Sequence, residues 1–314
     1  MSQERIFLGV LLLLHLSEHI VWIPSGFLLF RRRGRGWEVV TRGAILETHR
    51  GSLHWVWPLP GLARAHRVAS SEVWSSATIP GTGTPEAAAF DPAAVDRRRL
   101  EVAQDFLPLR WCSIGLLALI WAAAPLGVWL DGWVPTLAWW TPAVVVLMAV
   151  NAVVVARRHR LAFPGATDDR WRSVLSACLS PLAAIRSWDL AQRDALMGFH
   201  PVAVAAALPG FRDWEGFASM EWRHRRFPEN AAASRPTAAD GRGSNGTDRS
   251  AELLARLASI ARARGFDPSS WEAPPDPDDP GHTRYCPRCR GQFTSRAETC
   301  NACRGLPLLS LPKR

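Results

Sequence analysis

Three stretches of the chain are apolar over the length that a helix needs to cross a bilayer, which is about 20 residues. They are Ile6–Phe30, Trp111–Leu130 and Pro135–Ala156. The second and third contain no charged residue, and only the sequence DGWV at 131–134 separates them. The pattern therefore predicts three transmembrane helices (6–30, 111–130 and 135–156), the last two forming a tight hairpin.

Arginine gathers at one end of each predicted span, whereas the turn at 131–134 has none and only Arg5 precedes the first span. Loops on the cytoplasmic side of a membrane carry an excess of basic residues. We therefore expect an integral protein of a bacterial inner (cytoplasmic) membrane, with the N-terminus outside and the bulk of the chain in the cytosol. The arginines are Arg31, Arg32, Arg33, Arg35, Arg97, Arg98, Arg99, Arg110, Arg157, Arg158 and Arg160.

The predicted cytosolic section 31–110 has two kinds of pattern. Short alternating runs broken by Arg-Gly pairs, at 37–61, predict two or three strands of a small sheet. Asp91 followed by Pro92 is typical of a helix start, with an N-cap and a first-turn proline. This section therefore combines short strands with a helix that leads toward the second span.

After the third span, in region 157–229, apolar residues recur at helical spacing among polar ones. Ser180 and Pro181 form another helix-start pair, and Val174–Ile185 is too short to cross a bilayer. We predict helices that lie in the cytosol or on the membrane surface, and a path of 174–209 that re-enters the membrane is the alternative.

Composition divides the C-terminal part into four segments. Residues 230–248 have the composition of a flexible linker, and 249–265 have the spacing of an amphipathic helix that Gly265 ends. Residues 266–283 form an acidic, Pro-rich linker. It leads to the segment 284–306, which contains four of the six cysteines.

The cysteines have the spacing of a metal site. Cys286 and Cys289 are separated by two residues, as are Cys300 and Cys303, and Arg-Gly follows each pair. Two intervening residues let both sulfurs reach one metal from a tight turn, and the glycine can adopt a positive φ. Four thiolates form a closed tetrahedral site with no open position for water. Zinc is favoured, and two redox pairs or an iron–sulfur cluster are the alternatives.

The segment 284–306 resembles a short bacterial zinc ribbon, and the remainder resembles a bacterial multi-pass membrane protein. The resemblance implies that Cys286, Cys289, Cys300 and Cys303 bind a structural zinc ion, which supplies the folding energy that so small a piece lacks. The spacer 290–299 is shorter than the common 15–20 residues. We therefore expect a very small hairpin with Phe293 as its main apolar side chain.

A polar trio interrupts the predicted first span. His15, Glu18 and His19 form the sequence HLSEH, which is similar to the motif of the inverted zincin peptidases. That resemblance implies zinc binding by the histidines and water activation by Glu18. The second and third spans contain no His, Asp or Glu that could serve as a third ligand. Packing and hydrogen bonding, with Asn151 as a partner, is therefore favoured, and metal or haem binding comes second.

Composition and charge add little to this picture. The net charge is +9, but all basic residues except Lys313 are arginine, which indicates a GC-rich coding bias rather than a nucleic-acid partner. Tyr285 is the aromatic side chain that we expect to be exposed for base stacking. Arginines at 284, 288, 290, 296 and 304 make the module basic. A protein partner is favoured over nucleic acid, and membrane lipid is the other expected contact.

The expected fold is a mainly α membrane protein with three transmembrane helices, a small cytosolic β/α section, cytosolic or interfacial helices and a tethered zinc ribbon. Without a catalytic set of residues, the expected function is a non-enzymatic scaffold or regulatory protein that presents the ribbon to a cytosolic partner. The alternative is a metal-handling protein or metallopeptidase-like enzyme centred on His15, Glu18 and His19. The oligomeric state cannot be deduced from these patterns.

Overall fold

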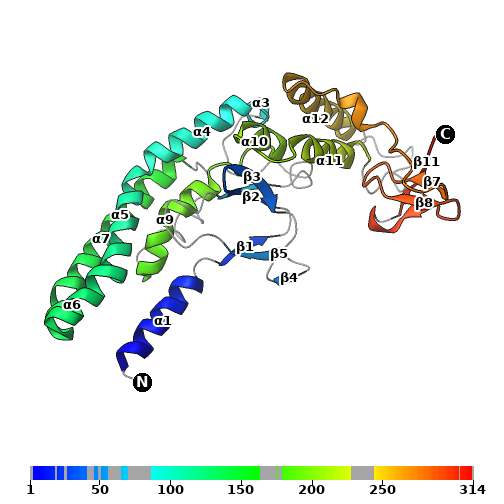
Figure 1. Cartoon of the computed structure of the whole chain (residues 1–314). Coiled ribbons are helices and arrows are strands. Elements are labelled where there is room, and N and C mark those ends of the chain that lie inside the picture. The colour runs from blue at the N-terminus through cyan, green and yellow to red at the C-terminus, as the bar shows by residue number, and fades with distance from the viewer. Residues whose placement is uncertain are drawn as a thin grey trace. The chain divides into compact units, whose positions relative to one another are not determined.

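The computed structural model describes residues 3–17, 20–24, 27–40, 46–48, 51–55, 65–69, 86–162, 175, 179–227, 244–303 and 305–312 (Figure 1). The chain divides into two compact units, Met1–Arg212 and Asp213–Arg314. Residues 230–243 of the predicted flexible linker lie outside the described part.

A long helical hairpin dominates the first unit. Helix α5 (Leu107–Ala118), a π-helical turn (Leu119–Ala123) and α6 (Ala124–Asp131) form one arm, and α7 (Trp133–Ala162) forms the other. The stretches Leu107–Asp131 and Trp133–Arg158 are long and apolar enough to cross a membrane. The turn between them is a single residue, Gly132, whose φ of 82° favours glycine. These are the second and third predicted spans, with a turn shorter than 131–134.

Pro125 explains the π-helical turn in the first arm. A proline cannot donate a backbone hydrogen bond, and its ring collides with the carbonyl four residues earlier, here that of Trp121. The helix adjusts by widening over Leu119–Ala123, as helices do at such positions. The indole Nε1 of Trp140, on α7, donates to the carbonyl of Leu119 at 3.0 Å. The two arms are therefore joined by a polar contact at the irregular turn.

The prediction of one continuous helix over Ile6–Phe30 is wrong, and a third span is not confirmed. Helix α1 (Gln3–Ser17) has 15 residues, which gives a length of about 22 Å against a hydrocarbon core of about 30 Å. Strands β1 (Ile20–Pro24) and β2 (Phe27–Arg33) follow. The sequence after the helix, IVWIPSGFLLF, is rich in β-branched and aromatic residues, and Pro24 and Gly26 interrupt it.

Two small antiparallel sheets follow α1. One has the order β1-β5-β4, with β4 at Leu46–Thr48 and β5 at Gly51–Trp55. The other has the order β3-β2-β6, with β3 at Gly36–Val40 and β6 at Ala65–Ala69. Strands β3, β4 and β5 lie in the section around 37–61 where the sequence predicted two or three. Strand β6 lies beyond that section, and β1 and most of β2 come from the supposed first span.

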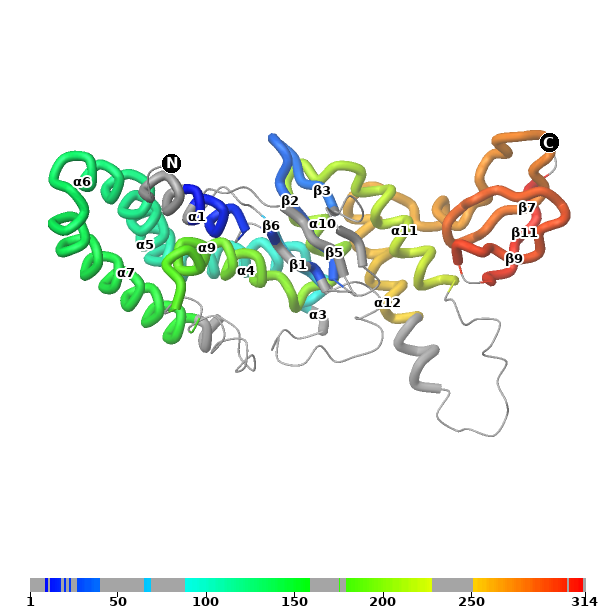
Figure 2. The backbone as a smooth tube through the Cα atoms, turned by 90° about the horizontal axis from the view of Figure 1, so that it is seen from below, coloured from blue at the N-terminus to red at the C-terminus, as the bar shows by residue number. Residues whose placement is uncertain are grey.

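Four further helices are described in the first unit. Helix α4 (Pro92–Asp105) follows a short helix, α3 (Glu86–Ala89), and begins as predicted, because the Asp91 carboxylate accepts from Ala93 N at 2.9 Å. Helix α9 (Pro181–Asp194) begins at the predicted N-cap Ser180. It lies beside α5 and α7 in both views (Figure 2). Helix α10 (Pro201–Ala207) is almost entirely buried.

The first turns of α9 pack on the middle of the hairpin. Leu182 and Ile185 of α9 are buried in one cluster with Leu116, Ile120 and Val144 of the two arms. The Ala184 carbonyl accepts from the Asn151 amide at 3.0 Å and from the Ser187 hydroxyl at 2.8 Å. Asn151 thus contacts α9, whereas Glu18 and His19, its predicted partners along with His15, lie outside the described residues.

The described part of the second unit contains two α-helices and a small β module. Helices α11 (Trp214–Arg226) and α12 (Ser244–Ala263) pack together with a 3-10 turn, η2 (Pro268–Trp271). Trp214 and Trp222 both pack against Trp271, with ring centroids 6.3 and 6.0 Å from it. The module has the strands β7 (His282–Tyr285), β8 (Gln292–Thr294), β9 (Thr299–Cys300), β10 (Leu306–Pro307) and β11 (Leu309–Ser310).

Candidate metal centre

The four cysteines lie in two turns that join consecutive strands. Cys286 directly follows β7 and Cys289 precedes β8, while Cys300 ends β9 and Cys303 ends a 3-10 turn, η3 (Asn301–Cys303), before β10. The strands form two sheets, ordered β11-β7-β8 and β10-β9. Each sheet thus carries one pair of cysteines at its edge, which is how residues eleven positions apart meet in space.

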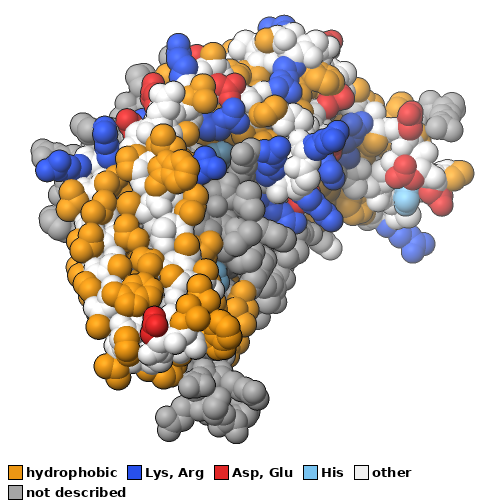
Figure 3. All heavy atoms as spheres, turned by 60° about the vertical axis from the view of Figure 1, so that its left-hand side comes forward, with side chains coloured by type: hydrophobic (Ala, Val, Ile, Leu, Met, Phe, Trp, Pro, Cys, Tyr) orange, Lys and Arg blue, Asp and Glu red, His pale blue; other side chains and the backbone are white. Residues whose placement is uncertain are grey.

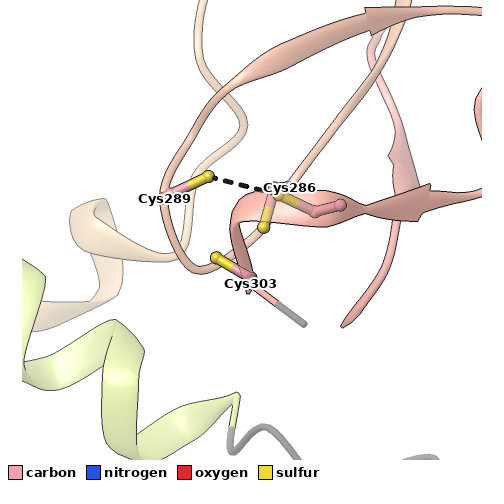
Figure 4. A group of neighbouring side chains, drawn as sticks. Cys286, Cys289 and Cys303 are labelled. Carbon is pink, nitrogen blue, oxygen red and sulfur yellow. Dashed lines mark hydrogen bonds between the residues drawn. The ribbon is translucent and has the colours of Figure 1, made fainter. Parts of the chain in front are cut away.

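The sulfurs converge with the spacing of a four-coordinate metal site. All four Sγ atoms lie within 4.8 Å of one another, and Cys289 Sγ lies 3.7 Å from Cys300 Sγ. A tetrahedral zinc ion with Zn–S bonds of about 2.3 Å separates its sulfurs by about 3.8 Å. Figure 4 shows the labelled Cys286, Cys289 and Cys303 directing their sulfurs toward a common centre. The arrangement can hold one metal ion.

Backbone groups stabilise negative charge on the sulfurs. Burial by itself raises the pKa of Cys289, but hydrogen bonds from the Gly291 backbone and from neighbouring thiols bring that pKa below its ordinary value. Burial raises the pKa of Cys286 despite hydrogen bonds from the backbone of Arg288 and Cys289, and it raises the pKa of Cys303 strongly. A metal cation is therefore what would allow all four sulfurs to be thiolates together.

The positive φ expected after each cysteine pair occurs, but not always on the glycine. In the second turn Gly305 has a φ of 83°. In the first turn Arg290, not Gly291, has the positive φ, of 62°. The Arg290 N–H donates to the Cys286 carbonyl at 2.8 Å, and the Cys286 N–H donates to the Gly291 carbonyl at 2.9 Å. These two hydrogen bonds close the turn and hold Arg290 in the left-handed region.

Apolar side chains cover the cluster on several sides. Cys286, Cys300 and Cys303 are buried together with Leu306, whereas Cys289 is exposed. Phe293 packs against the cluster as expected, but Phe227 and Leu308 do so as well. Phe227 caps the end of α11, so the filler of this module comes partly from outside the segment 284–306.

Polar contacts attach the first cysteine turn to α11. Arg223 Nε donates to the Arg288 carbonyl at 3.1 Å, and Arg288 Nη2 lies 3.4 Å from His224 Nδ1. Arg290 Nη2 donates to the Ala273 carbonyl, in the predicted acidic linker, at 3.2 Å. In that linker Trp271 is buried, so the segment 266–283 is partly packed rather than extended between two modules.

Sequence patterns missed this support because it is not local. Arg223 lies 65 residues before Arg288, and nothing in the spacing of either indicates the contact. The one signal in the sequence was the helical spacing of Trp214, Phe217 and Trp222, which lie on the buried face of α11. Tyr285, expected to be exposed, is buried at 6% exposure, which removes the aromatic platform considered for base stacking.

The predicted HLSEH site is only partly described. His15 is buried near the end of α1, and its ring lies 5.3 Å from that of Trp121, in the π-helical turn. Glu18 and His19 lie outside the described residues, so the trio stays a prediction. Within the described part of the chain, the group of three or more metal-ligating side chains is the cysteine cluster.

Comparison of the chain with protein-family models, with curated proteins and with solved structures found no match. The chemistry of the site must therefore be inferred from its own residues.

Proposed function

We propose that this protein is a membrane-anchored, non-enzymatic scaffold or regulatory protein, whose hairpin crosses the bilayer and whose C-terminal module presents a structural zinc site to a cytosolic partner. The observation that carries the proposal is the convergence of four sulfurs within 4.8 Å. Four sulfur ligands complete a tetrahedral zinc shell, so no position is left for a water or a substrate. A closed site of this kind supports a fold rather than a reaction.

The choice of zinc follows from the chemistry of the ligands. Zinc is a d¹⁰ ion whose electrons favour no particular geometry, so it accepts the tetrahedral arrangement that four thiolates at the edges of two small sheets can provide. The module has few buried apolar side chains, and such small folds depend on a metal for their stability.

The surface of the hairpin supports the membrane anchor. Only 22% of the most apolar stretch of each arm is buried, whereas a core helix of a soluble protein is mostly buried. Figure 3 shows hydrophobic side chains covering this face, with arginine side chains gathered toward one end. The exposed Trp111 and Trp129 are 18 residues apart along one arm, or about 27 Å, which matches tryptophan at the two interfaces of a bilayer.

Metal analysis of the purified full-length protein tests the zinc site. We expect one zinc ion per chain by mass spectrometry, and its loss when Cys286 and Cys289 are both replaced by serine. Cys112→Ser is the matched control, because Cys112 is buried in the hairpin, far along the chain from the cluster. Iron with a visible absorption band, or zinc that persists in the double variant, would contradict the proposal.

Membrane insertion and sidedness need a separate experiment. The protein should stay in the membrane fraction after an alkaline wash. Of two reporters fused to the C-terminus, the one that works only in the cytosol should be active, and the one that works only outside the cell should not. Release of the protein by the wash would refute the anchor without affecting the zinc result. A C-terminus outside the cell would refute the presentation of the module to a cytosolic partner.

A further inference from the structure

A basic cleft lies in the first unit, where the hairpin meets the sheet. Its volume is about 690 Å³, within the range of small-ligand sites. Four arginines line it from three separate elements of the chain. Arg32 and Arg35 come from β2 and the turn after it, Arg99 from α4, and Arg110 from the start of α5.

Most of these arginines have no carboxylate partner among the described residues. Arg31 and Arg33, on the other face of β2, pair with Glu38 at 2.8 and 3.8 Å. Arg99 pairs with Asp96 on its own helix at 3.0 Å. In contrast, Arg32, Arg35 and Arg110 make no ion pair within the described part of the chain. Arg31 and Arg33 thus share one carboxylate on one face of the strand, whereas the positive charge on the face that lines the cleft has none among the residues that the structure describes.

One acidic side chain also lines the cleft and bears on its charge. Asp189, on α9, is buried, and its Oδ2 lies 3.9 Å from Nε of Arg186, which is buried beside it. Because Arg186 balances this carboxylate, the four lining arginines give the cleft a net positive charge.

The remaining walls carry apolar side chains together with His66, Gln104 and Gln192, and the cleft lies at the end of the candidate span. Trp37 is buried opposite Arg32 in the β2–β3 pairing, and Trp188 of α9 forms another wall. Leu100 and Leu107 line the cleft and are exposed. Leu107 is the first residue of the span Leu107–Asp131, at the end away from the Gly132 turn. A molecule in this cleft would thus contact both guanidinium groups and the apolar surface of the hairpin.

We propose that this cleft binds the phosphate group of an anionic phospholipid, with the headgroup among Arg32, Arg35, Arg99 and Arg110 and the acyl chains along the exposed surface of α5. A guanidinium group can donate two parallel hydrogen bonds to two oxygens of one phosphate, and basic residues at the membrane surface attract anionic lipid. A lipid source is favoured over a free phosphate because the cleft adjoins the membrane-facing helix. The inference relies on the membrane anchor proposed above, but not on the zinc site.

Native mass spectrometry of the full-length protein in neutral detergent tests this assignment, with phosphatidylglycerol as probe and zwitterionic phosphatidylcholine as comparison. Each basic group near an anionic surface contributes about fivefold to binding, so replacing Arg32, Arg35 and Arg110 by Gln should weaken phosphatidylglycerol binding about a hundredfold. The corresponding Lys variant, which keeps the charge, should retain part of it. Phosphatidylcholine binding should change little in either variant.

Matched controls separate a site from a general effect of charge. Gln at Arg97, Arg157 and Arg158 removes the same charge from exposed arginines that flank the spans but do not line the cleft, and it should preserve lipid binding. Equal loss in both triple variants, or loss in neither, would overturn the proposal. So would binding of glycerol phosphate as tightly as of the lipid, because the cleft would then be a site for a soluble phosphate.

Two further measurements keep these outcomes distinct from other failures. Each variant should retain its zinc and the unfolding temperature of the wild-type protein, which shows that it folds. If the alkaline wash shows that the protein is not inserted, the anchor has failed. If the inserted protein shows no preference for phosphatidylglycerol over phosphatidylcholine, the cleft assignment alone has failed.

Discussion

A single backbone angle makes Arg290 an unusual residue in the metal module. Its φ of 62° lies in the left-handed region, which costs a residue with a Cβ about 1 kcal/mol. The first cysteine turn needs this conformation, because it brings the Gly291 backbone to the Cys289 sulfur. The sequence pattern suggested that glycine would fill the role, and in the second turn Gly305 does so.

We therefore predict that Arg290→Gly stabilises the zinc-bound module relative to Arg290→Ala by up to about 1 kcal/mol. Both variants lose the side-chain hydrogen bond to Ala273, so their difference isolates the backbone angle. Competition with a chromogenic chelator measures the zinc affinity of each. A glycine variant that binds zinc no better than the alanine variant would show that the turn is not strained at this residue.

His66 should make the first unit sensitive to acid. It is buried in β6, stacks on Trp37 with ring centroids 5.0 Å apart, and has its Nδ1 2.9 Å from the Gln192 carbonyl. Burial lowers the pKa of His66 to about 4; the hydrogen bond to the Gln192 carbonyl opposes this shift, and the nearby charge of Arg99 adds to it. The unfolded chain binds the His66 proton more tightly than the folded protein does. The contribution of His66 to the free energy of unfolding is therefore fully present above pH of about 6.5 and falls by about 3 kcal/mol toward pH 4.

Replacing His66 by Phe, which can keep the stack, should flatten that pH dependence. Unfolding is best compared between pH 4 and 7 in protein with Cys286 and Cys289 replaced by serine, so that zinc loss does not contribute. Other charged groups at the same cleft are Arg32, Arg35, Arg110 and Asp189, and they are the same in both proteins. An unchanged slope in His66→Phe would place the acid sensitivity elsewhere.

At the scale of elements, local signals predicted helix starts well and the first span poorly. Asp91 and Ser180 accept hydrogen bonds at their helix starts because capping depends on residues two or three positions away. Apart from the polar positions around His15, Glu18 and His19, the run 6–30 is apolar, and apolar character alone does not separate a membrane helix from a helix followed by buried strands. Pairing with β5 and β6, which are distant in sequence, determined the strands there.

A buried amide adds a polar contact to the apolar packing of α9 against the hairpin. Asn151 donates to the Ala184 carbonyl from the middle of α7, and both residues are buried. We predict that Asn151→Ala lowers the stability of the first unit by about 1 kcal/mol, since a hydrogen bond between apolar helices is lost. Thermal unfolding in detergent measures the change. Val150→Ala is the control, because Val150 is exposed on the same helix, and an equal effect of both changes would argue against the contact.

At the scale of the whole molecule, the metal site could be predicted and its support could not. The four cysteines identify themselves because ligand pairs are close in sequence and the chemistry of thiolates is specific. The packing of the cysteine turn on α11 joins residues about 65 positions apart, through a backbone carbonyl that any residue provides. The basic cleft likewise draws its arginines from β2, the turn after it, α4 and α5, so no segment of the sequence contains it.

The division into two units leads to a prediction about zinc removal. The sulfurs are the centre of the β module, so without metal only a few apolar side chains remain to hold it, and binding of a structural zinc contributes about 10–16 kcal/mol in small modules. The tryptophan cluster of α11 and η2 has its own contacts, including the Trp222 indole donating to Glu272 at 3.2 Å. A strong chelator should therefore make residues 284–306 sensitive to protease while tryptophan fluorescence of the cluster and the unfolding of the first unit stay unchanged. Re-addition of zinc should restore protection in the wild-type protein but not in the double serine variant. If the chelated module instead kept its resistance to protease, its apolar contacts with α11 would be sufficient for folding, and the ion would not be structural.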